Sequence, residues 1–111
     1  MINSLMNWKK ETIMRLFELT HLPLHERIFE FLRLHRIIRN RADYSRIYLG
    51  RSRSYMNTLE YNGHSPSRES WETLREGLDS LHGQVTAPNI KEVLQDFTTQ
   101  VERKLNLFGS A

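Results

Sequence analysis

Near the middle of the chain stands the sequence LGRSRSYMNTLE, residues 49–60. Its glycine, Gly50, suits a tight turn, because glycine adopts a positive φ at little steric cost. Leu49, Met56 and Leu59 lie where they would pack one helix against another on either side of that turn. We therefore expect two short helices that pack together across a turn at Gly50.

Helical patterns continue on both sides of this stretch. Apolar residues recur every three or four positions, as in amphipathic helices, and no pair of segments alternates like a β-hairpin. Pro23, the Asn62–Gly63 loop, the cap Ser67 and Pro88 divide the helices from one another. The sequence predicts an all-α bundle of about six helices in a single domain, 1–111, with helices over 3–20, 24–40, 43–49, 52–61, 67–82 and 88–108.

Composition excludes several classes of protein. The 111 residues are 39% hydrophobic and 26% charged, which is ordinary for a globular chain. The absence of cysteine rules out disulfide scaffolds, thiolate metal sites and thiol nucleophiles. Residues 1–8 lack the pattern of a signal peptide, and no apolar run reaches the roughly 20 residues of a membrane helix. We expect a cytoplasmic protein without a membrane segment.

The charge is unevenly distributed. The net charge of the whole chain is +3, but residues 33–53 hold seven arginines and one aspartate, a net +6. Arginine's planar fork suits phosphate groups and guanine edges better than the ammonium group of lysine does. The basic segment therefore favours a nucleic-acid partner, with a merely solvated basic face as the alternative.

Residues 49–60 resemble the helix-turn-helix of lambda-repressor-like (Cro/XRE-type) DNA-binding domains. The similarity continues through the Asn62–Gly63 loop, the Pro66–Ser67 helix start and an apolar helix containing Trp71, and it covers roughly residues 27–82. The resemblance implies a helix-turn-helix core over 24–82. It also implies a transcriptional regulator, most simply a repressor, that binds double-stranded DNA with helix 52–61 in the major groove.

The outer face of helix 52–61 carries short polar side chains. Arginine can bond guanine, and asparagine adenine, through two hydrogen bonds each. We expect the base-reading residues to be Arg53, Ser54, Asn57, Thr58 and Tyr61. The residues better placed for phosphates, which position a protein without reading sequence, are Arg41, Arg46, Arg51, Ser52 and Asn62.

Two helices flank the expected core. Helices 3–20 and 88–108 each have an apolar stripe that a minimal domain would not need. Either they fold back and enlarge the core, or they form the interface of a homodimer that places two recognition helices along the duplex. The preferred dimerisation residues are Ile90, Val93, Leu94, Phe97, Val101 and Leu105.

Three residues depart from the family pattern. Ser45, Arg46 and Arg51 occupy places that are usually apolar or small in the family. A rotated second helix could compensate through Tyr44, Ile47 and Tyr48. The alternative function is therefore a helical adaptor or anti-activator that keeps the scaffold but binds another regulatory protein.

No set of residues indicates an enzyme, a metal site or a cofactor. His21 and His25 have the spacing of metal ligands on a helix, but Pro23 separates them. We therefore expect two exposed loop histidines. The residue types of a hydrolytic triad occur without any nucleophile turn. Trp8 and Trp71 are expected in the core.

Overall fold

The structure is a computed structural model that describes residues 21–108, and in this part of the chain all regular secondary structure is helical, without strands. Helix α2 covers Leu24–Leu34, and α3 (Arg41–Asp43) continues directly into a π-helical turn, η2 (Tyr44–Tyr48). Then follow α4 (Tyr55–Asn62), α5 (Arg68–Gln84) and α6 (Pro88–Phe108). The all-α prediction is confirmed. The predicted helix 3–20, with Trp8, lies outside the described residues.

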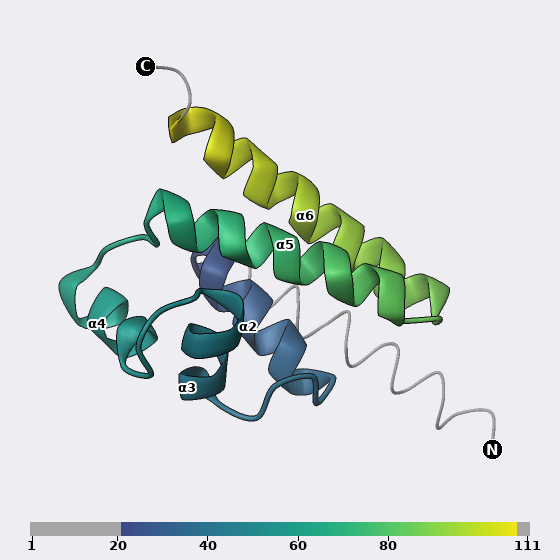
Figure 1. Ribbon diagram of the computed structural model, residues 1–111, viewed down its shortest axis with the longest axis horizontal. Helices are drawn as coiled ribbons and strands as arrows, with labels where there is room; N and C mark the ends of the chain where they lie inside the picture. Colours follow the sequence, from purple (N-terminus) through teal and green to yellow (C-terminus); the bar gives the residue numbers. More distant parts are fainter. Residues whose placement is uncertain (1–20, 109–111) are drawn as a thin grey trace.

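The longest elements, α5 and α6, run antiparallel and pack side by side (Figure 1). The shorter elements lie on one side of this pair (Figure 1), where η2 packs against α5, α2 against α6, and α4 against α3 and η2. Leu74 and Leu78 of α5 and Leu94 and Val101 of α6 are fully buried. Burying one such side chain stabilises the fold by roughly 1.5–3 kcal/mol. The contact between α5 and α6 therefore contributes much of the stability of the fold.

Helix α6 belongs to the core of its own chain, which corrects part of the predicted dimer interface. Leu94, Phe97 and Val101 are at most 5% exposed, and the ring of Phe97 meets that of Phe31 at 5.5 Å. They are therefore unavailable to a second copy. The other three residues, Ile90, Val93 and Leu105, are half-buried and pack against the same core.

Helix α2 is shorter than predicted. It ends at Leu34 rather than near Asn40, because Arg36 adopts a left-handed backbone with φ of 59°. The Asn40 side chain then accepts a hydrogen bond from the Asp43 amide at 2.9 Å and caps α3. The next helix accordingly begins at Arg41, two residues earlier than expected.

The turn before α4 is confirmed at Gly50, which has φ of 64°. The predicted cap at Ser52 is wrong, since α4 starts at Tyr55 and the Ser52 carbonyl only closes a turn to the Tyr55 amide. The predicted cap Ser67 is confirmed: its hydroxyl accepts from the Ser70 amide at the start of α5. Trp71 is buried, as expected.

Candidate nucleic-acid interface

Helix α4 has one buried and one exposed face. Met56 and Leu59 are buried against the rest of the molecule, with Met56 wholly inaccessible. Every residue predicted to read bases is exposed, Tyr61 to 91%. The exposed members are Arg53, Ser54, Asn57, Thr58 and Tyr61.

Ser45 explains how α4 packs so closely on η2. Its side chain is fully buried, and its hydroxyl accepts a hydrogen bond from the Met56 amide at 3.2 Å. That amide lies in the first turn of α4, where the helix offers no acceptor of its own. Ser54, the residue before the helix, makes no side-chain capping bond. The unexpected serine in η2 therefore caps α4 from outside. Tyr44 and Tyr48 supply the apolar contacts as buried residues, but the prediction for Ile47 is wrong, since its side chain is 60% exposed.

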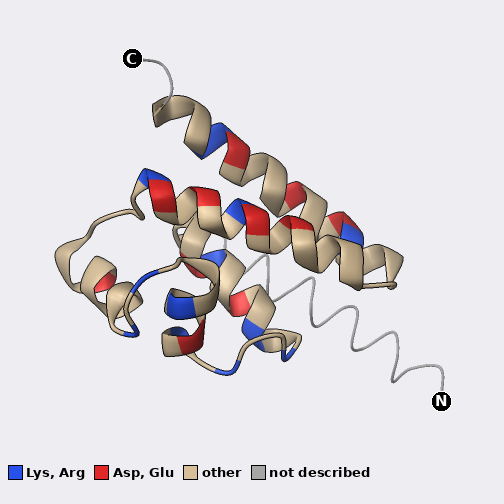
Figure 2. Ribbon diagram, in the orientation of Figure 1, with Lys and Arg blue, Asp and Glu red and all other residues tan. Residues whose placement is uncertain are grey.

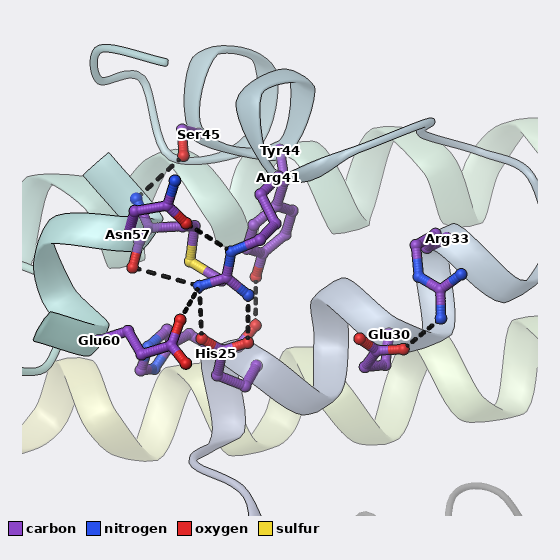
Figure 3. A network of polar contacts seen from close by, with 10 residues as sticks. His25, Glu30, Arg33, Arg41, Tyr44, Ser45, Asn57 and Glu60 are labelled. Atoms are coloured by element: carbon purple, nitrogen blue, oxygen red, sulfur yellow. Dashed lines mark hydrogen bonds and ion pairs between the residues drawn. The ribbon is translucent and has the colours of Figure 1, made fainter. Parts of the chain in front are cut away.

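Arg41 is at the centre of a polar network (Figure 3). Its two Nη groups donate to both carboxylate oxygens of Glu26 at 3.0 and 3.1 Å, and Nη2 also donates to Glu60 at 3.0 Å. Its Nε donates to Oδ1 of Asn57 at 2.9 Å. The hydrogen bond to Glu26, together with the charges of Glu26, Glu60 and Glu30, outweighs burial and raises the pKa of Arg41.

This network changes what Arg41 can do. Two carboxylates balance its charge, and its side chain is only 29% exposed. The predicted phosphate contact is therefore replaced by a structural role, joining α2, α3 and α4. Asn57 stays exposed but is held by Arg41, which fixes the orientation of its amide.

Arg51 connects the turn to the start of α5. Its Nε donates to the Ser70 hydroxyl at 3.1 Å and its Nη2 to the Ser67 hydroxyl at 2.7 Å. Its guanidinium also lies 5.5 Å from the ring centre of Tyr55. Burial would raise the pKa of Tyr55, but hydrogen bonds from Ser70 and Ser67 lower it, helped by the charge of Arg51. The side chain remains 40% exposed, so part of it can still face a ligand.

Three arginines and Asn40 line an open groove of about 300 Å³ beside α3. Arg39 and Arg46 both bind Asp43, through Nε at 3.3 Å and Nη2 at 3.2 Å. Burial would raise the pKa of Asp43, but the hydrogen bonds and charges of Arg39 and Arg46 lower it overall. Arg53, also in this groove, makes no hydrogen bond or ion pair with any residue that the structure describes.

The charges separate over the molecule. Figure 2 shows most acidic side chains along α5 and α6, and many basic ones around α3 and the loops beside it. Within the basic segment 33–53, several arginines are paired with acids from elsewhere in the chain. The positive potential is therefore concentrated in fewer places than the sequence count indicates.

His25 is not the exposed loop histidine that the sequence predicted. It lies in α2, is 4% exposed, and its ring meets that of Trp71 edge-on at 6.2 Å. Burial is the main cause that lowers the pKa of His25, so the ring is neutral at pH 7. No cluster of three metal-ligating side chains occurs within residues 21–108.

A known protein family matches most of the chain. A family described as "Family of unknown function (DUF6626)" matches residues 25–106, from the start of α2 almost to the end of α6. The chain belongs to the DUF6626 family. The match includes α6, so the DUF6626 unit extends beyond the predicted core 24–82. No curated protein and no solved structure matches the chain.

Sequence reasoning missed two contributors to this surface. Glu26 neutralises Arg41 from a helix 15 residues away, and no local pattern signals that pairing. Arg39 belongs to the basic segment, but no local pattern distinguishes it from the other arginines. Its place in the groove depends on where the loop after α2 turns. The predicted residue Asn62 is exposed at the end of α4, and Ser52 is exposed in the turn.

Among the described helices, none is long and apolar enough to span a membrane.

Proposed function

We propose that this DUF6626 protein binds double-stranded DNA through α4 and regulates transcription, most simply as a repressor. The fold in this proposal is a helix-turn-helix in which α3 with η2 is the first helix and α4 the recognition helix. The observation that carries it is the division of α4 into a buried face, Met56 and Leu59, and an exposed face of small hydrogen-bonding side chains.

The dimensions of α4 suit this role. Eight residues make a helix about 12 Å long, comparable with the width of the major groove. The helix carries no lysine or arginine of its own, so affinity must come from its neighbours. Arg51 follows Gly50 at one end of the turn, and the groove of Arg39, Arg46 and Arg53 lies beside α3. Arginines around a polar helix provide phosphate contacts on both sides of a reading surface.

The proposed contacts differ in part from those expected from the sequence. Base reading is assigned to Ser54, Asn57, Thr58 and Tyr61, which are exposed on or directly before α4. Asn57 can accept a second hydrogen bond at Oδ1 and donate through Nδ2, so its bond to Arg41 leaves adenine recognition open. The phosphate set keeps Arg46, Arg51, Ser52 and Asn62, loses Arg41, and gains Arg39 and Arg53 from the groove.

Selection of bound duplexes from a random DNA pool tests the proposal. Enrichment of one short sequence motif is the expected result, and a palindromic motif would indicate that two copies bind together. The triple variant Ser54→Ala, Thr58→Ala, Tyr61→Ala should enrich a shorter and weaker motif, because Asn57 alone still reads bases. A matched control, Ser80→Ala with Gln95→Ala on exposed parts of α5 and α6, should enrich the same motif as the wild type.

A protein-binding adaptor or anti-activator is the second candidate. It is favoured by two exposed apolar side chains, Ile47 of η2 at 60% and Tyr61 of α4 at 91%. It is also favoured by the pairing of Arg41 with Glu26 and Glu60, which reduces the local positive charge. Failure to shift any duplex at about 50 mM salt, where phosphate attraction is strong, would favour this candidate over DNA binding.

A further inference from the structure

We propose that the groove lined by Arg39, Arg46 and Arg53 is a binding site for one phosphate group. Asn40 and Ala42 complete its lining together with Asp43. The proposal rests on the proposed function for one point, the identification of a DNA backbone phosphate as the source of that group. The phosphate site itself can be tested without DNA.

The charge of the groove favours an anion. Three guanidinium groups and one carboxylate give it a net charge of two positive units. Elsewhere in the basic segment, Arg41 meets Glu26 and Glu60, and Arg51 meets Glu69, all acids from other helices. The groove therefore keeps an excess of positive charge at a place where the chain supplies a single acid.

Asp43 positions two of the three arginines. Its carboxylate binds Arg39 through one oxygen and Arg46 through the other, and its side chain is only 12% exposed. The arginine side chains themselves are 87% and 57% exposed. A guanidinium has about five N–H donors, so each of these arginines keeps most of its donors for a ligand. The shared carboxylate reduces the conformational freedom that both would lose on binding.

Arg53 provides the third side of the groove from a different segment. It lies in the turn that precedes α4, and it has no partner among the described residues. Arg53, which has no partner among residues 21–108, and two arginines held by Asp43 converge on an open space of about 300 Å³. This arrangement matches the planar, multidentate way in which arginine binds phosphate oxygens. Arg53 is thereby assigned to a phosphate rather than to a base.

Inorganic phosphate is the first probe. Titration of the full chain, followed by the backbone NMR signals of Asn40, Ala42 and Arg53, should give saturable shifts that sodium chloride at equal ionic strength does not reproduce. Arg39→Gln, Arg46→Gln and Arg53→Gln should each weaken binding roughly fivefold or more, as expected on removing one charged hydrogen-bonding partner. Arg36→Gln is the matched control, an exposed arginine in the same loop but outside the groove, and should bind as the wild type does.

The proposal is overturned if the shifts do not saturate, or if Arg36→Gln weakens binding as much as the three groove variants. Binding of random-sequence duplex provides the second arm. Arg53→Gln should lower the salt slope by about one unit and weaken selected and random DNA equally. If phosphate binds in the groove but the three variants leave DNA affinity unchanged, the site stands as one for a free phosphate group. The DNA proposal then loses its groove contacts.

Discussion

Arg41 shows how one side chain can hold three helices together. Its guanidinium donates to both carboxylate oxygens of Glu26 in α2 and to Glu60 of α4, and it lies 5.5 Å from the ring centre of Phe29. Glu26 is only 14% exposed, so it depends on this partner. A buried carboxylate that loses its bidentate partner is left with an unbalanced charge.

Arg41→Lys is therefore expected to lower the free energy of unfolding by about 2 kcal/mol, because lysine cannot make the paired bonds to one carboxylate. Urea unfolding followed by circular dichroism measures the change. The control is Arg33→Lys, in an exposed pair with Glu30, which should change stability by less than about 0.5 kcal/mol. An equal loss of unfolding free energy in the two variants would show that the network around Arg41 contributes no more to stability than an exposed ion pair does.

His25 gives the fold a dependence on pH. Burial lowers the pKa of His25 below 6.5, its ordinary value. Between the folded and unfolded pKa the unfolded chain binds more protons, so the free energy of unfolding falls as the pH drops below about 6.5. Burial lowers the pKa of His35 as well, and this residue adds to the same trend.

His25→Gln should consequently reduce the loss of stability between pH 7 and pH 5, even if it lowers stability at pH 7. The measurement is the slope of the unfolding free energy against pH from urea titrations. An unchanged slope for His25→Gln would mean that this histidine is not held neutral by the fold.

Among the elements, α5 contains a glycine that its helix propensity does not explain. A Cβ at Gly77 would lie 2.7 Å from Cδ1 of Tyr48. Gly77 thus allows the buried Tyr48 ring of η2 to approach the backbone of α5. This contact is part of what sets the position of η2, and through Ser45 that of α4.

Gly77→Ala is expected to destabilise the protein by about 1–3 kcal/mol, since overpacking exceeds the gain of roughly 1 kcal/mol in helix propensity. Gly83→Ala, in the last turn of the same helix with no atom within 4 Å of its added Cβ, should be neutral or slightly stabilising. Thermal unfolding of both variants distinguishes the effects. A rise in the melting temperature of Gly77→Ala would contradict the close packing of Tyr48.

The elements themselves follow largely from local signals. Gly50, Ser67 and Pro88 mark turns or helix starts where the structure has them, because a positive φ, a side-chain cap and a fixed φ are properties of single residues. The predicted end of α2 is wrong because the turn that ends it is made by Arg36, and arginine has no preference for a positive φ. The start of α4 was misplaced because its cap, Ser45, comes from another helix.

Over the whole molecule, the sequence could indicate the sign of the charge but not where it remains unbalanced. The net charge of +6 on residues 33–53 is partly balanced by acids that form ion pairs with its arginines, namely Glu26, Glu30, Glu60 and Glu69. These acids come from outside the segment, so no count along the chain could find them. The same limit applies to α6, whose apolar stripe suggested a dimer and instead covers α5 and Phe31.

The central claim is that α4 reads DNA sequence. Its most direct measurement is the ratio of affinities for a pool-selected duplex and a scrambled duplex of equal length, taken by fluorescence anisotropy at one stated salt concentration. The account predicts a ratio of about 10³ or more for the wild type. For Ser54→Ala, Thr58→Ala, Tyr61→Ala, in which only Asn57 still reads bases, it predicts a ratio lowered by about tenfold or more, with affinity for the scrambled duplex retained. A triple variant that keeps the wild-type ratio, or a wild type that binds neither duplex, would contradict it.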